Sequence, residues 1–480
     1  MHIVQLILSI IYLSVAFFTI VAIIHDRRDP VKTLAWILVI CLIPIGGVIL
    51  YVAVGRNHRK EKLFNRKEIV DLQQIDGLCN TQLQYLGGPE SLVADEVARN
   101  KSFITLLLNN NKSMLTLHNK VEILNNGEAT FEALFEAIRG AQESIHLEYY
   151  IIEYDEIGSQ LCRLLAEKAA AGVEVRVIYD DVGSWKLKYQ CIKRLRKQGI
   201  DIRCFMPVFF PWLSSKVNYR NHRKIAIIDG KIGFTGGINV ADRYVKGTKR
   251  GPWRDTHLRI EGDAVTSMQL LFATDWYFVS DKQWLNHPKY YPMPSVTNLS
   301  PMQIIHSGPD SDWASIMQSY FAAINTARKS IYVTTPYFLP NQAILTALKV
   351  ASLSGKDVRI ILPSYSDSKI TYWASRSYVG ELLEAGVNIY FYKEGFNHSK
   401  LIIIDGEFCS VGSANLDIRS FEDNFEVTAL MYDPAIAEEL TRYFMEDLER
   451  SEEITREMWE ARPNLHGLYE SISRLFSPLL

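Results

Sequence analysis

The first sixty residues hold two long apolar stretches, whereas the rest of the chain mixes apolar and polar positions. Ile3–Ile24 and Thr33–Val54 each contain no charged residue. A helix of this length extends about 33 Å, which exceeds the ~30 Å hydrocarbon core of a membrane. A signal peptide fits less well, because the first stretch is too long and lacks a basic leader. Buried helices of a soluble core rarely give two such stretches. The pattern therefore predicts a two-helix transmembrane hairpin over residues 1–55.

Positively charged side chains flank these stretches unevenly. The tail before Ile3 carries none, and nine follow in the loop and after the second stretch: Arg27, Arg28, Lys32, Arg56, Arg59, Lys60, Lys62, Arg66 and Lys67. Because basic residues favour the cytoplasmic side, this distribution predicts a multi-pass protein of the cell membrane with its larger domain in the cytoplasm. The three basic residues in the loop weigh against that orientation.

Beyond the hairpin, the pattern predicts a tether and then two similar α/β halves. Residues 56–115 are polar and irregular, with a break at "LGGPES", and are interpreted as the tether. From about residue 117, strand-like and helix-like runs alternate, and the same order returns later in the chain. Proline-containing residues 288–310 mark the linker. We therefore expect an α/β fold with a first half at 116–290 and a second half, ending in a C-terminal helix, at 300–480.

One stretch of the chain occurs twice. "NHRKIAIIDGKIGFTGGINVADR" at 221–243 and "NHSKLIIIDGEFCSVGSANLDIR" at 397–419 are identical at ten of 23 positions. Chance would give roughly one or two identities at ordinary residue frequencies. Each copy has the pattern of a strand, an Asp-Gly turn and a returning strand, because Asp-Gly favours tight turns with positive φ. The repeat therefore predicts two equivalent hairpins.

Each hairpin carries the same set of polar groups. Residues i and i+2 of a strand face the same side, so the histidine and the lysine of each His-x-Lys point together. Each returning strand ends in a glycine-containing turn that presents an asparagine. The two sets are His222, Lys224 and Asn239, and His398, Lys400 and Asn415.

Two such sets around a pseudo-two-fold axis would suit a phosphodiester. The lysines and amides would offset its negative charge and stabilise the pentacoordinate transition state. One neutral imidazole can attack phosphorus. The opposite imidazole, protonated, can give its proton to the leaving alkoxide and later take one from an incoming alcohol. No metal or cofactor is needed, since lysine is a poor metal ligand and no carboxylate–histidine cluster has metal spacing.

Two aspartates of the repeat, Asp229 and Asp405, allow two interpretations. Each ends a strand at the predicted turn. A structural role in the turn is therefore as reasonable as a catalytic one, and both remain candidate catalytic residues.

Composition narrows the possible functions. The net charge of −2 gives no bulk signature of a nucleic-acid binder. Six cysteines without a Cys-x-x-Cys pair argue against a structural zinc site or a disulfide framework. The hydrophobic fraction of 48% fits a globular protein with membrane segments.

The paired motifs resemble those of the phospholipase D superfamily, whose mark is two His-x-Lys-x-x-x-x-Asp motifs with a downstream Gly-Ser or Gly-x-Asn. The resemblance covers roughly residues 117–450. It implies two tandem α/β/α sandwich halves related by pseudo-two-fold symmetry, with the active site between them. It implies that the N-terminal motif supplies the nucleophile, His222, and that His398 is the general acid and then base. Sequence symmetry alone does not decide between the two histidines.

The resemblance also implies supporting residues. A carboxylate after each motif orients an imidazole, and the matching positions are Asp255 and Glu426, for which ordinary salt bridges are the alternative. Asn239, Asn415 and Ser413 are expected to bind the substrate phosphate. The first copy has Gly237 where the second has Ser413, so the two halves need not bind phosphate equally.

With the apolar hairpin and the tail "SRLFSPLL", the whole chain resembles bacterial cardiolipin synthases. The implied reaction transfers a phosphatidyl group from one phosphatidylglycerol to another, giving cardiolipin and glycerol through a phosphohistidine. The implied partners are phosphatidylglycerol and membrane lipids, without nucleotide or nucleic acid, and the oligomeric state is left open. The alternatives are a hydrolase of the same superfamily, another phosphatidyltransferase, and an inactive membrane scaffold.

Two further segments are candidates for membrane contact. The aromatic stretch 205–213 fits either an insertion into the lipid interface or a packed core insert. Residues 465–480 fit a helix whose apolar face contacts either membrane or the domain itself. That face carries Leu468, Ile472, Leu475 and Leu479.

Overall fold

The computed structural model describes most of the chain, in eight ranges: 2–25, 30–43, 45–51, 72–87, 95–208, 219–280, 287–311 and 313–477. The chain divides into two units. The smaller contains Met1–Glu61 and Val208–Tyr219, and the larger contains Lys62–Pro207 and Arg220–Leu480.

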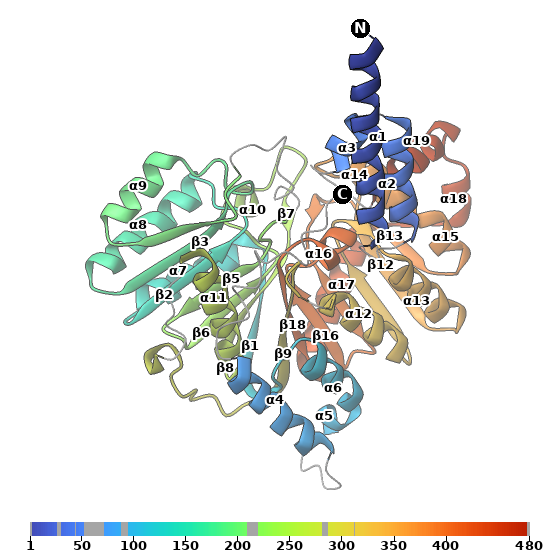
Figure 1. The fold of residues 1–480 in the computed structure, drawn as a ribbon. Coiled ribbons are helices and arrows are strands. Elements are labelled where there is room, and N and C mark those ends of the chain that lie inside the picture. The colour runs from blue at the N-terminus through green and yellow to red at the C-terminus, as the bar shows by residue number, and fades with distance from the viewer. Residues whose placement is uncertain are drawn as a thin grey trace. The chain divides into compact units, whose positions relative to one another are not determined.

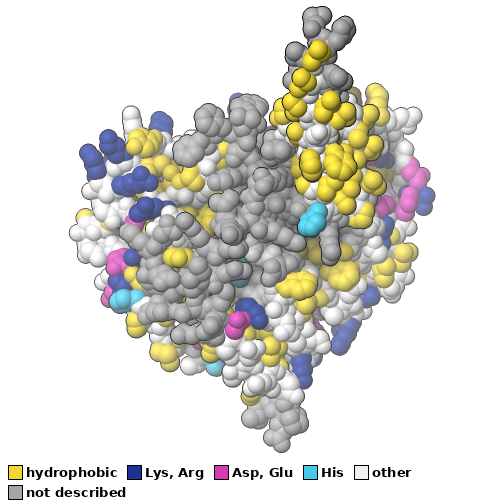
Figure 2. All heavy atoms as spheres, in the orientation of Figure 1, with side chains coloured by type: hydrophobic (Ala, Val, Ile, Leu, Met, Phe, Trp, Pro, Cys, Tyr) yellow, Lys and Arg dark blue, Asp and Glu magenta, His cyan; other side chains and the backbone are white. Residues whose placement is uncertain are grey.

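The described part of the smaller unit is helical, with α1 (His2–His25), α2 (Pro30–Leu42) and α3 (Gly46–Leu50). A small cluster of buried side chains holds these helices together: Ala16, Ile23, Ile40 and Tyr51. Apolar side chains cover the outside of α1, where Leu13, Phe17 and Phe18 are each more than 60% exposed (Figure 2).

Within the described residues, no helix combines the length and the apolar character that crossing a membrane requires. The structure therefore does not support the predicted transmembrane hairpin. Its second predicted span is divided, because α2 has only 13 residues and Ile45, with a φ of 64°, precedes α3. Residues 26–29 and 52–71, which hold most of the flanking basic side chains, lie outside the described residues.

Residues 72–110 are largely helical, so the interpretation of 56–115 as an irregular tether is wrong for this part. The helices are α4 (Leu72–Gly87), α5 (Asp95–Arg99) and α6 (Lys101–Asn110). Their apolar positions face the core of the second half, where the ring of Phe103 lies 5.2 Å from that of Phe408. Only one face of each helix is apolar, which made the segment look polar in sequence. Residues 56–71 lie outside the described residues.

A single 15-stranded sheet runs through the larger unit (Figure 1). The first half contributes β1 (Thr116–Asn125), β2 (Ser144–Tyr149), β3 (Glu174–Asp180), β4 (Asp201–Phe205), β5 (Lys224–Ile228), β6 (Ile232–Gly236) and β8 (Thr256–Gly262). The second half contributes β9 (Leu299–Ser307), β10 (Ser330–Thr334), β12 (Asp357–Pro363), β13 (Asn388–Tyr392), β15 (Leu401–Ile404), β16 (Phe408–Gly412), β18 (Glu426–Met431) and β19 (Ser451–Ile454).

The strand order confirms two tandem halves with the same topology. The order β1-β8-β6-β5-β2-β3-β4 in the first half matches β9-β18-β16-β15-β10-β12-β13 in the second. In both, the first four pairings are antiparallel and the last two are parallel. The antiparallel pair β1–β9 joins the halves into one sheet. The expected linker 288–310 therefore includes a central strand, β9, after the short 3-10 helix η5 (Pro288–Tyr290).

Helices cover both faces of this sheet (Figure 1). Those of the first half are α7 (Asn126–Gly140), α8 (Glu156–Ala170), α9 (Tyr189–Lys197), α10 (Arg243–Lys246) and α11 (Ala264–Ser280). Those of the second half are α12 (Ser315–Thr326), α13 (Gln342–Leu353), α14 (Lys369–Arg376), α15 (Val379–Glu384), α16 (Ile418–Glu422), α17 (Pro434–Glu449), α18 (Arg456–Glu460) and α19 (Asn464–Arg474).

The period of two along each strand determines which helices it meets. Ala226 and Ile228 of β5 belong to the core under α7 and α8. On the opposite face, Gly233 of β6 lies so close to α11 that a Cβ there would be 2.7 Å from Met268 Sδ. The sheet is therefore a middle layer, as an α/β/α sandwich requires.

Both predicted Asp-Gly turns are present. Asp229 and Gly230 have φ of 53° and 64°, and Asp405 and Gly406 have φ of 57° and 67°. These positive values explain why the sequence uses aspartate and glycine at both turns.

The C-terminal helix α19 packs on α14 through one face. The ring of Trp373 lies 4.9 Å from that of His466 and 5.4 Å from that of Tyr469. The apolar face predicted from sequence remains largely open, since Leu468, Ile472 and Leu475 are 54%, 48% and 78% exposed. Leu479 lies outside the described residues, as do residues 209–213 of the aromatic stretch.

Candidate active site

Short backbone pairings across the two halves position the two motif histidines. The His222 N–H donates to the Phe425 carbonyl at 2.9 Å, and the His398 N–H donates to the Arg254 carbonyl at 2.7 Å. The second contact continues a parallel pair between β7 (Trp253–Arg254) and β14 (Phe396–Asn397). Each histidine therefore begins its motif beside the segment that precedes β8 or β18 of the opposite half.

Because of this pairing, each motif imidazole contacts a carboxylate of the opposite half. His222 Nδ1 lies 2.9 Å from Glu426 Oε1, and His398 Nδ1 lies 2.7 Å from Asp255 Oδ2. Both carboxylates are completely buried. A carboxylate accepts from Nδ1–H, so each Nε2 is left with a lone pair. The structure thus brings each expected orienting residue to a motif imidazole, but to the one in the other half.

Both imidazoles lie on the wall of one cavity of about 690 Å³. Aromatic rings pack around them: the Tyr150 ring is 4.9 Å from His222, and the Trp253 ring is 5.1 Å from His398. The cavity wall also includes Asn239 and Asn415.

The motif lysines lie behind the imidazoles and are buried. Each donates from Nζ to the carbonyl of its own motif histidine at 2.6 Å. Lys400 Nζ is also 3.0 Å from His398 Nδ1. Burial lowers the pKa of Lys224 to about 7 and that of Lys400 to about 8.

Burial also lowers the pKa of both imidazoles. The pKa of His222 falls to about 4 and that of His398 to about 3, with the nearby lysines adding to the effect and the carboxylates opposing it. Burial alone would raise the pKa of Glu426 and Asp255, yet both stay below their ordinary values because each faces a histidine and a lysine. At neutral pH the unliganded site therefore holds two neutral imidazoles beside two carboxylates.

The three expected phosphate ligands differ in placement. Asn239 Nδ2 donates to the Tyr244 hydroxyl at 2.6 Å, and Asn415 Nδ2 donates to Asp417 at 3.0 Å, so both amides are held in place at the cavity wall. Ser413 is fully buried, and its hydroxyl donates to Glu426. The hydroxyl thus supports the carboxylate that contacts His222, and the contact of Ser413 with the substrate phosphate stays a prediction.

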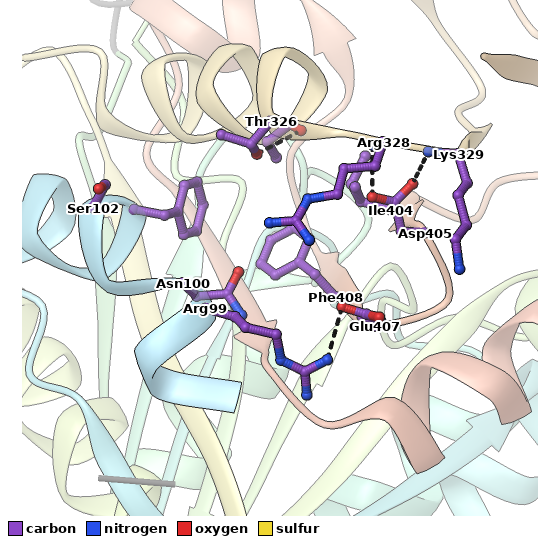
Figure 3. A pocket seen from close by; sticks show the side chains of 12 residues that line it. Arg99, Asn100, Ser102, Thr326, Arg328, Lys329, Ile404, Asp405, Glu407 and Phe408 are labelled. Carbon is purple, nitrogen blue, oxygen red and sulfur yellow. Dashed lines mark hydrogen bonds and ion pairs between the residues drawn. The ribbon is translucent and has the colours of Figure 1, made fainter. Parts of the chain in front are cut away.

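The two motif aspartates hold backbone at the far ends of their strands. The Asp405 carboxylate accepts N–H bonds from Arg328 and Lys329 at 2.7 and 2.6 Å (Figure 3). It also accepts from the Ser330 N–H at 2.8 Å. Asp229 accepts three equivalent bonds from residues 142–144. These contacts fit a structural role of Asp229 and Asp405 in the turn, which was one of the two interpretations of these residues. A second cavity, of about 330 Å³, adjoins Asp405 between α6 and the turn.

Three arginines on the cavity wall were not among the expected site residues: Arg220, Arg243 and Arg419. Arg220 is buried and pairs with Asp180 at 3.3 Å. Arg243 and Arg419 are the last identical positions of the two repeated stretches. The identity of these two positions could have marked both arginines as site residues. An arginine at the end of a motif can have many other roles, however, so the identity alone did not single them out.

The fold and the paired motifs are those of the phospholipase D superfamily. A family model described as "Cardiolipin synthase, PLD-like domain" matches residues 134–252 and 320–448, and one described as "Phospholipase_D-nuclease N-terminal" matches residues 14–56. The chain therefore belongs to the cardiolipin synthase family of this superfamily.

Individual relatives agree with this assignment. A cardiolipin synthase of Geobacillus sp. (strain WCH70) is 44% identical, covering 97% of this chain and 92% of its own. One of Alkalihalophilus pseudofirmus is 42% identical, covering 98% and 94%. The solved structure of a Haemophilus influenzae phosphatidylserine synthase has a TM-score of 0.59 at 14% identity, covering 80% of this chain and 100% of its own, which shows a shared fold.

The exchange of carboxylates predicts which substitutions act on the same imidazole. Glu426→Gln should lower the initial rate of phosphodiester cleavage about 10²- to 10⁴-fold, because His222 loses its oriented tautomer. Adding Glu426→Gln to His222→Ala should cost little more, since the imidazole it serves is already gone. Rates measured with enough protein to record residual activity, on variants with unchanged thermal unfolding, test this. Non-additivity between Glu426 and His398 instead would contradict the crossed assignment.

Proposed function

We propose that this protein catalyses transfer of a phosphatidyl group from one phosphatidylglycerol to another, giving cardiolipin and glycerol. The observation that carries the proposal is the pair of oriented imidazoles, His222 and His398, on one cavity. The family of the chain supplies the lipid substrates. Two imidazoles in this arrangement can perform both halves of an exchange between phosphodiesters, in which no energy from a nucleotide is required.

In the first half-reaction, Nε2 of one imidazole attacks phosphorus while the bond from phosphorus to the glycerol oxygen breaks. The opposite imidazole, protonated, gives its Nε2 proton to that oxygen, and glycerol leaves. From the family resemblance, the attacking residue is His222 and the acid is His398. The negative phosphodiester, once bound, opposes the nearby lysine charges and favours the proton on His398.

In the second half-reaction, a hydroxyl of the second phosphatidylglycerol gives its proton to the now neutral His398. The oxygen bonds to phosphorus, and the bond between phosphorus and His222 Nε2 breaks. Lys224 and Lys400, in their protonated forms, offset the negative charge that develops on the phosphate and so stabilise the transition state. The products are cardiolipin and free enzyme.

The stoichiometry of this reaction is a direct test. Purified protein in mixed micelles, given phosphatidylglycerol alone with EDTA and without CTP, should release one glycerol for each cardiolipin formed. Chromatography of the lipids and an enzymatic glycerol assay measure both products. Phosphatidic acid as the main lipid product would mean that water, rather than a second lipid, takes the phosphatidyl group.

The pH dependence follows from the lowered pKa values. The reaction needs one protonated and one neutral imidazole, and the imidazole pKa values of about 4 and 3 put the ascending limb below pH 3 and the maximum of kcat/KM between pH 3 and 4. Above it, kcat/KM should fall by roughly tenfold per pH unit. The fall should steepen above pH 7–8, where Lys224 and Lys400 lose their protons. A kcat/KM that stays constant from pH 5 to 9 would contradict the paired-imidazole mechanism.

We further propose that the N-terminal segment attaches the protein to the cell membrane as a multi-pass anchor, with the larger unit in the cytoplasm. The apolar side chains exposed on α1, such as Phe17 and Phe18, support attachment. The apolar stretches 3–24 and 33–54 and the basic residues that follow them support the topology. The open face of α19, with Leu468 and Leu475, adds a second surface for lipid contact.

Fractionation distinguishes an anchor from a peripheral contact. The full-length protein should stay in the membrane pellet after washing with alkaline carbonate, because spanning helices resist extraction. In intact spheroplasts, protease added from outside should leave the larger unit uncut. Release by carbonate would contradict the membrane-spanning anchor, and digestion from outside would contradict the orientation.

A further inference from the structure

The proposed reaction needs a cation for the phosphate of its acceptor lipid, and the two motifs do not supply one. Its acceptor, a second phosphatidylglycerol, is itself an anionic phosphodiester. The His and Lys groups surround the phosphorus under attack, so the acceptor phosphate needs another cation on the same cavity. Without one, the acceptor would have to approach an anionic site with its own charge uncompensated. The need for this cation, and the choice of a residue that supplies it, rest on the proposed function.

Arg243 and Arg419 are candidates for that cation. They occupy equivalent positions in the two halves, four residues after Asn239 and Asn415. Both lie on the wall of the cavity that holds the two motif histidines. A guanidinium stays charged at all pH values used for assay and fits phosphate oxygens with two parallel N–H groups.

The two arginines have different aromatic neighbours, and these neighbours contact different histidines. The guanidinium carbon of Arg243 is 5.4 Å from the centre of the Tyr244 ring, which is 6.3 Å from the His398 ring. The charge of Arg419 instead acts on the Tyr150 hydroxyl, lowering a pKa that burial raises, and the Tyr150 ring is 4.9 Å from His222. Arg243 is therefore on the side of His398, and Arg419 is on the side of His222.

The geometry of displacement determines which side receives the acceptor. The leaving alcohol departs opposite the attacking nitrogen, and the acceptor alcohol must enter along the same line when that nitrogen is displaced. With His222 as the nucleophile, the acceptor lies on the side of His398. We propose that Arg243 binds the phosphate of the acceptor phosphatidylglycerol and so selects an anionic lipid acceptor over a neutral alcohol.

Arg243 keeps donors for this contact. Its Nη1 donates to Glu153 at 2.6 Å, and Glu153 also accepts from Lys186 at 3.0 Å. A guanidinium has five N–H groups, so one ion pair leaves others for a ligand on the cavity side. The ion pair also offers a control, because a purely structural role for Arg243 would act through Glu153.

The experiment compares two acceptors for the same phosphohistidine. Cardiolipin formation from phosphatidylglycerol uses the anionic acceptor, and incorporation of labelled glycerol into phosphatidylglycerol uses a neutral one. Both rates are measured in one preparation of the full-length protein, for wild type and for Arg243→Gln, Arg243→Lys, Arg419→Gln and Glu153→Gln. Arg163→Gln, at an exposed position of α8, is the matched control for loss of an arginine.

We expect Arg243→Gln to lower the ratio of cardiolipin formation to glycerol incorporation at least tenfold, mainly through a higher KM for the lipid acceptor. Arg243→Lys should recover part of the ratio because it keeps the charge. Glu153→Gln and Arg163→Gln should leave the ratio near that of wild type.

Three results would overturn the proposal. An unchanged ratio in Arg243→Gln would exclude an acceptor-phosphate contact, and an equal loss in Glu153→Gln would reduce Arg243 to a structural ion pair. A selective loss in Arg419→Gln alone would place the acceptor on the side of His222 and make His398 the nucleophile. Failure of the proposed function looks different, since wild type would then produce neither cardiolipin nor labelled phosphatidylglycerol.

Discussion

Each motif imidazole takes its carboxylate from the opposite half, and the rest of the site depends on that exchange. Glu426 contacts His222 Nδ1, and Asp255 contacts His398 Nδ1. A half alone would hold an imidazole without a fixed tautomer and a buried carboxylate without a partner, and an unpaired buried charge is costly. The chemistry therefore belongs to the junction between the halves rather than to either half.

The junction is built to hold that geometry. Backbone N–H bonds from His222 and His398 cross it, and β7 pairs with β14 beside it. A buried ion pair between Arg254 Nε and Asp447 Oδ1, at 3.0 Å, also joins the halves. Because β1 and β9 join the two sheets into one, the halves meet along a continuous layer that resists rotation.

Sequence reasoning found what short-range patterns encode. The Asp-Gly turns, the hairpins that follow His222 and His398, and the repeated halves followed from local spacing. The crossed pairs did not, because residues 204 positions apart meet only through the junction. Helices α4–α6 were missed because each shows a single apolar face, and the contact of Ser413 with Glu426 was missed because Glu426 lies on a neighbouring strand.

The two motifs are alike, but the surroundings of the two carboxylates that contact their imidazoles differ. A Cβ at Gly237 would lie 2.0 Å from Asp255 Oδ1, so the first half has no room for a serine there. Glu426 is longer than Asp255 by one methylene, and the Ser413 hydroxyl donates to its carboxylate. The facing His222 and Lys224, with a smaller contribution from that donor, keep the pKa of Glu426 low despite burial. Two imidazoles with the same motif thus have differently supported carboxylates, which fits the separate nucleophile and acid–base roles proposed for them.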